Sequence, residues 1–72
     1  MNDVFVSTLD FVPNYSIIES KGQIFSPRLN SFLQNTNTLK DIAFKMGCNA
    51  VINIKHSDGH AYGEAVIIKK NN

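Results

Sequence analysis

The chain has 72 residues, a length sufficient for one small domain. Its hydrophobic fraction of 43% is too high for a disordered segment. The formal net charge is +1, and only Lys69-Lys70 concentrates basic residues, so the composition disfavours nucleic-acid binding. No run of about 18 apolar residues occurs, which disfavours a membrane-spanning helix, and a single cysteine without a signal-peptide pattern is typical of a cytoplasmic protein.

Two strands are expected in the first third of the chain. Residues 4–8 form a β-branched and aromatic run, which predicts a short edge strand or an extended arm within residues 1–14. Residues 15–25 predict a longer strand with alternating faces. Gly22 inside that strand indicates a bulge or a close approach of another backbone segment.

A helix is predicted over residues 27–46. Ser26 is the expected N-cap and Pro27 the first helical residue, where its missing N–H costs nothing. Apolar residues then recur at helical spacing, as Leu29, Phe32, Leu33, Leu39, Ile42, Ala43 and Met46. The Asn-Thr-Asn-Thr stretch at 35–38 has low helix propensity, so a break there remains open. Gly47 is expected to end the helix in the left-handed conformation.

The last third predicts a β-hairpin over residues 49–69. Asp58-Gly59 is a strong type I′ turn dipeptide, and this turn sets Ser57 opposite His60 and His56 opposite Ala61. Continued without interruption, the register places Ala50, Ile52 and Ile54 beneath the helix. It places the pairs Val51–Val66, Asn53–Glu64 and Lys55–Tyr62 on the opposite face.

These elements predict an α+β fold, strand-helix-strand-strand, in which one helix packs on one face of an antiparallel sheet that ends in a hairpin. The helix stripe can cover only one face of that sheet. The other face would keep four apolar side chains, which we expect to form an interface between subunits: Ile17, Val51, Val66 and Ile68.

Three parts of the chain carry recognisable motifs. Two lie near its end, GCNAVINI (47–54) and AYGEAV (61–66), and the third is an opening that carries Ser7-Thr8, Pro13, Tyr15, Ile17, Glu19 and Gly22. On these residues the chain resembles the YbjQ-like proteins over about residues 5 to 70. Cys48 stands where that family has alanine, Glu64 stands where it has threonine, and the family's insertion before the helix is missing. The resemblance implies a homo-oligomer joined through its sheets, typically a ring of five subunits, with a heavy-metal-binding label and an open molecular role.

Candidate chemistry is sparse in this sequence. His56 and His60 are the residues for a metal site, but they lie on opposite faces of the predicted hairpin, and Cys48 would be about 25 Å away. Such a site would therefore need ligands from neighbouring subunits. No acid, base and nucleophile set is recognisable, so we expect no enzyme and no cofactor.

The function expected from the sequence is a non-enzymatic oligomeric module that binds a small ligand or a protein at its subunit interfaces. Five residues are the expected ligand contacts: Ser7, Thr8, Asn53, His60 and Tyr62. The alternative is a metal-binding protein that uses His56 and His60 across subunits.

Overall fold

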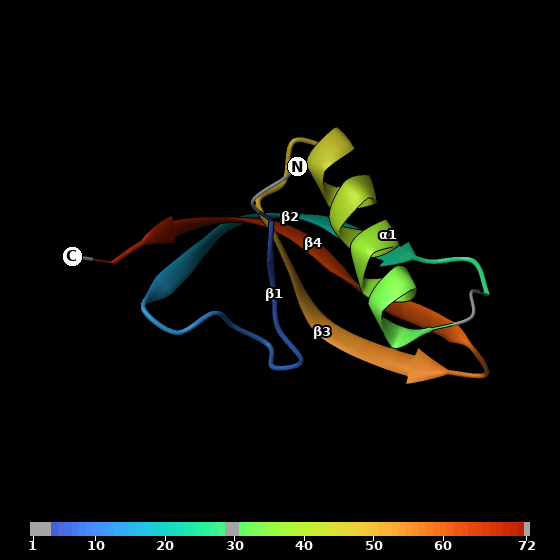
Figure 1. Ribbon diagram of the computed structural model, residues 1–72. Coiled ribbons are helices and arrows are strands. Elements are labelled where there is room, and N and C mark those ends of the chain that lie inside the picture. The colour runs from blue at the N-terminus through green and yellow to red at the C-terminus, as the bar shows by residue number, and fades with distance from the viewer. Residues whose placement is uncertain (1–3, 29–30, 72) are drawn as a thin grey trace.

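The computed structural model describes residues 4–28 and 31–71 and confirms the α+β fold. Helix α1 (Phe32–Lys45) packs on one face of a four-stranded sheet of order β1-β3-β4-β2 (Figure 1). The strands are β1 (Phe5–Val6), β2 (Tyr15–Phe25), β3 (Ala50–Ser57) and β4 (His60–Lys70). The pairs β2–β4 and β3–β4 are antiparallel, and the second is the predicted hairpin. β1 lies parallel to β3, so the sheet is mixed rather than wholly antiparallel.

The helix begins later than predicted, because Ser26, directly after β2, is hydrogen-bonded to β4. Its N–H donates to the Ala61 carbonyl at 2.8 Å, and its hydroxyl accepts from the Ala61 N–H at 2.9 Å. Ser31 is the N-cap instead, since its hydroxyl accepts from the Gln34 N–H at 3.1 Å. Pro27 therefore precedes the helix, and Leu29 lies outside the described residues.

The low-propensity stretch does not break the helix (Figure 1). Asn35 is buried and donates from its side-chain amide to the Gly59 carbonyl at 3.0 Å. Thr38 donates its hydroxyl to the Gln34 carbonyl one turn back, at 2.9 Å. Contacts with the hairpin and within the helix thus offset the poor intrinsic propensity.

Gly47 ends the helix as predicted, with φ at 81°. Its N–H donates to the Phe44 carbonyl at 3.0 Å, and the Cys48 N–H donates to the Ala43 carbonyl at 2.9 Å. These two bonds form a Schellman motif, which satisfies carbonyls that the last turn would leave unpaired.

The hairpin turn is the predicted one, but the register changes within the strands. Asp58 and Gly59 have φ of 52° and 81°, as a type I′ turn requires, and Ser57–His60, His56–Ala61 and Lys55–Tyr62 pair as expected. A bulge follows, because the register shifts between Ile52 and Lys55 and Asn53 adopts φ of 54°.

Beyond the bulge every side chain of β3 changes face. Val51 pairs with Ala65 rather than with Val66 and packs beneath the helix, so its predicted position is wrong. Ala50 and Ile52, expected beneath the helix, lie on the opposite face. A shift of one residue in register has this effect because side chains alternate along a strand.

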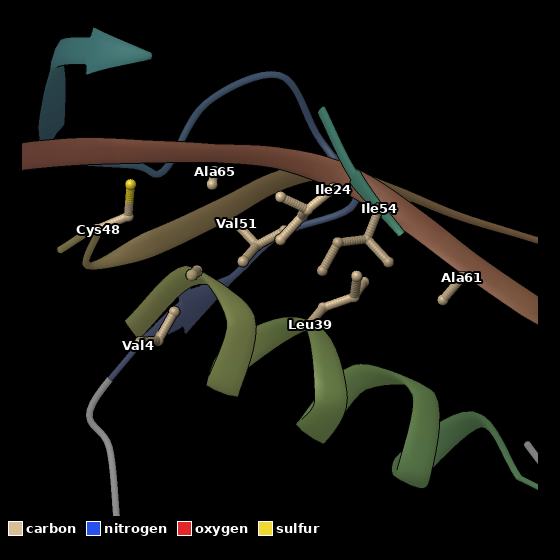
Figure 2. Close-up of a cluster of buried hydrophobic side chains, with 9 residues drawn as sticks. Val4, Ile24, Leu39, Cys48, Val51, Ile54, Ala61 and Ala65 are labelled. Atoms are coloured by element: carbon tan, nitrogen blue, oxygen red, sulfur yellow. The ribbon is translucent and has the colours of Figure 1, made fainter. Parts of the chain in front are cut away.

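The sheet has a core on each face. The helix-side cluster, shown in Figure 2, comprises Val4, Ile24, Leu39, Ala43, Cys48, Val51, Ile54, Ala61 and Ala65. The far-face cluster comprises Val12, Ala50, Ile52, Val66 and Ile68, with Tyr15 half-buried against it. Val12 comes from the segment between β1 and β2, which therefore supplies the cover for the far face.

This segment corrects the expectation that the far face is left uncovered. Val66 and Ile68 lie under this segment and are 0% and 4% exposed within one chain. Val51 lies beneath the helix and is 0% exposed, so none of the three needs a second subunit for burial. Ile17 alone among the four expected interface residues is substantially exposed, at 43%.

Candidate ligand-binding cleft

The segment between β1 and β2 covers only part of the far face. Nearer the Asp58-Gly59 turn the same face carries an open cleft of about 440 Å³. Its lining comes from three strands: Gln23 of β2, Asn53 and Lys55 of β3, and Tyr62, Gly63 and Glu64 of β4. A volume of this size is typical of small-molecule sites.

The β3 bulge positions Asn53 in the cleft. At the bulge the Asn53 N–H donates to the Leu9 carbonyl at 2.8 Å, and the Ile54 N–H donates to the Ser7 carbonyl at 3.1 Å. Ile54 packs in the helix-side cluster, while the neighbouring Asn53 lines the cleft. The bulge thus puts two consecutive residues on the far face, with Ile52 in the far-face cluster and Asn53 in the cleft.

Gly63 is the residue of β4 that lies opposite the bulge, and its lack of a side chain is a packing requirement. A Cβ at this position would lie 2.8 Å from Val51 Cγ1, 2.9 Å from the Ile52 carbonyl oxygen and 3.2 Å from Ile54 Cγ1. Contacts this short are repulsive. The cleft therefore depends on glycine at Gly63, because only glycine leaves room for the bulged strand beside it.

The polar side chains form two cross-strand pairs. Lys55 faces Tyr62 across β3 and β4, and Gln23 faces Glu64 across β2 and β4. The Tyr62 ring packs against the Phe25 ring in a tilted contact with centroids 6.4 Å apart. The first pair offers an ammonium and a phenol, and the second offers an amide and a carboxylate.

Glu64 is held on the β2 side of its strand. The Ser20 hydroxyl of β2 donates to Glu64 Oε2 at 2.5 Å. Lys55 lies on β3, on the other side of β4, and no salt bridge joins it to a carboxylate within the described ranges. Both charges of the cleft are therefore available to a ligand.

Two of the five expected ligand contacts, Asn53 and Tyr62, line this cleft. Ser7 and Thr8 lie elsewhere and border a smaller, mostly apolar cavity of about 90 Å³ beside Phe32 and Thr36 of the helix. His60 lines neither cavity, and its Nδ1 is 3.4 Å from the Ser26 carbonyl oxygen. The five residues therefore do not form one site within a single chain.

The residues considered for metal binding have separate surroundings. The His56 ring stacks on Phe32 with centroids 4.1 Å apart, whereas His60 lies beside Ser26. Cys48 is buried in the helix-side cluster, and this burial raises the pKa of its thiol. Over residues 4–28 and 31–71, no three His, Cys, Asp or Glu side chains form a group that could hold a metal ion.

Sequence reasoning missed Gln23, Lys55, Gly63 and Glu64 as cleft residues. The signal for two of them was present, because the predicted register already placed Lys55 and Glu64 on one face with Asn53 and Tyr62. Gln23 could be added only once the pairing of β2 with β4 was known.

None of the described helices is long and apolar enough to cross a membrane. In comparisons with known proteins, no protein family and no curated protein matches the chain.

Proposed function

We propose that the protein is a non-enzymatic binding module that takes up a small polar ligand in the cleft between β2, β3 and β4. The observation that carries this proposal is the lining itself, a concave site of about 440 Å³ in which five of the six residues bring polar side chains from three strands. The rigid sheet beneath them would hold these groups in place without a ligand, which lowers the entropic cost of binding.

The polar groups of the cleft retain hydrogen-bonding capacity. Among the described contacts, the side chains of Gln23, Asn53 and Lys55 have no hydrogen bond or ion pair, and Glu64 uses one oxygen for Ser20. A ligand would thus replace water at these groups without first breaking hydrogen bonds within the protein. The single thiol of the chain plays no part in the cleft, since Cys48 is buried on the helix side of the sheet.

The proposal is tested by following backbone amide signals in NMR spectra during titration with small neutral, anionic and cationic metabolites. A ligand of the cleft shifts the amides of Asn53, Tyr62 and Gly63. Asn53→Gly deletes the side-chain amide but keeps the left-handed conformation at φ of 54°, so it should weaken binding about tenfold with the fold retained.

Asn14→Gly is the matched control for this substitution, because Asn14 also has positive φ, at 68°, and does not line the cleft. It should leave the affinity unchanged. If no metabolite class shifts the cleft amides, or if both glycine variants weaken binding equally, the proposed function is wrong.

We also propose that subunits associate through the outer edge of β2, as part of a cytoplasmic homo-oligomer. The support is that β2 ends the sheet as an edge strand and exposes Ile17, Ile18 and Phe25 at 43%, 61% and 63%. The five-subunit ring remains a prediction from the resemblance to the YbjQ-like proteins. Light scattering should give a multimer for the wild type and a folded monomer for Ile17→Lys; a wild-type monomer at micromolar concentration would contradict the proposal.

A further inference from the structure

The charges of the cleft point to the class of its ligand. Lys55 and Glu64 share the cleft, yet they belong to different cross-strand pairs on different strands. Lys55 pairs with Tyr62, so Glu64 is its diagonal neighbour on β4. Diagonal neighbours in an antiparallel sheet lie about 7–8 Å apart, within reach of two long side chains. The two charges are nevertheless not joined by a salt bridge.

The separation has a visible cause in Ser20. Its hydroxyl binds Glu64 Oε2 from β2, on the side of β4 remote from Lys55. Gln23, directly opposite Glu64, adds an amide carbonyl on the same side. The cleft is therefore bipolar, with an acceptor end at Gln23 and Glu64 and a donor end at Lys55 and Tyr62.

We infer that the cleft binds a small zwitterion, whose carboxylate contacts Lys55 and Tyr62 and whose ammonium contacts Glu64 and Gln23. This inference rests on the proposed function, because it names the ligand class of the same site. A simple anion at Lys55 would be repelled by the nearby carboxylate of Glu64, and a simple cation at Glu64 would be repelled by Lys55. A zwitterion replaces both repulsions with charge-assisted hydrogen bonds.

The test compares one zwitterion with its two singly charged analogues. Titrations at low ionic strength use 4-aminobutyrate, butyrate and butylamine, and NMR shifts of the Tyr62 and Gly63 amides report occupancy of the cleft. We expect 4-aminobutyrate to bind about tenfold more tightly than either analogue. A parallel series from glycine to 6-aminohexanoate measures which separation of the two charges fits best.

Three variants assign the charges. Lys55→Met should remove the advantage of 4-aminobutyrate over butylamine, and Glu64→Gln should remove its advantage over butyrate. Lys69→Met is the matched control, because Lys69 is an exposed lysine of β4 outside the cleft, and it should leave all three affinities unchanged. The dispersion of the amide spectrum shows in each case that the variant is folded.

The outcomes separate this inference from the proposed function. If butyrate, butylamine or a neutral metabolite binds the cleft at least as tightly as the tightest member of the glycine to 6-aminohexanoate series, the zwitterion inference is wrong and the proposed function stands. If none of the compounds shifts the cleft amides, including the wider metabolite set, both fail.

Discussion

A methyl group added at Gly63 tests the packing that supports the cleft. In Gly63→Ala the new Cβ would lie 2.8 Å from Val51 Cγ1 and 2.9 Å from the Ile52 carbonyl oxygen. The second contact is with backbone, so a change of side-chain rotamer cannot relieve it. Overpacking of this kind costs about 1–3 kcal/mol, and we expect the upper half of that range.

Urea denaturation followed by circular dichroism measures this change, with the midpoint lowered and the slope unchanged. In a domain of this size, each kcal/mol lowers the melting temperature by about 4–8 °C. Gly63 does not have positive φ, so backbone strain does not contribute and the loss is steric. In a double-mutant cycle, Val51→Ala should relieve part of the clash, with a favourable coupling of about 1 kcal/mol. A loss below about 0.5 kcal/mol in Gly63→Ala would refute the reasoning, since ordinary surface substitutions fall within that range.

Three further substitutions test other parts of the fold. Gly47→Val should cost more than about 1 kcal/mol in chemical denaturation, because a β-branched residue is strained at φ of 81°; a loss within error would contradict the cap. Burial raises the pKa of the Cys48 thiol, so the thiol's contribution to stability is complete below the ordinary pKa of 9.0 and is lost as the pH rises through the folded-state pKa. Cys48→Ala should therefore reduce the fall of the melting temperature with rising alkaline pH, and an unchanged dependence on pH would argue against this. Thr36→Val should raise the free energy of unfolding by about 1 kcal/mol, since the buried Thr36 Oγ1 has no described partner. A decrease of similar size would mean that the hydroxyl makes a hydrogen bond.

The elements that could be predicted from sequence are those fixed by local chemistry. The hairpin turn and the helix end require positive φ, which Asp58, Gly59 and Gly47 tolerate better than most residues. The predicted turn and the predicted end of the helix were therefore correct. The bounds of β2 were also predicted as observed, because its flanks carry Pro13-Asn14 and Ser26-Pro27. Ser26-Pro27 misled the prediction of the helix start, since the pairing of Ser26 with Ala61 depends on residues far along the chain.

The bulge at Asn53 explains most of the remaining error. Asparagine tolerates the left-handed conformation, but a single asparagine inside an apolar run does not by itself indicate one. Its conformation is secured by the bonds that the Asn53 and Ile54 N–H groups donate to Leu9 and Ser7, a contact between distant segments. Because the bulge was not predicted, residues 50–52 of β3 were assigned to the wrong faces. Val51 was therefore expected to need cover from another subunit, although it lies beneath the helix.

The strand order sets the sequence of events during synthesis on the ribosome. Among the described strands, β1 pairs with β3 alone and β2 with β4 alone, so none of these pairs can form until the chain has been made beyond Ala50. Until then α1 is the one described helix or strand that can form by itself, because its hydrogen bonds are local. The hairpin of β3 and β4 closes through a two-residue turn, a process of about 1–10 µs, whereas β1 and β2 must close long loops onto it. The β3–β4 hairpin is thus the template on which the earlier-made β1 and β2 fold, and nascent chains that stall before β4 should depend on chaperones.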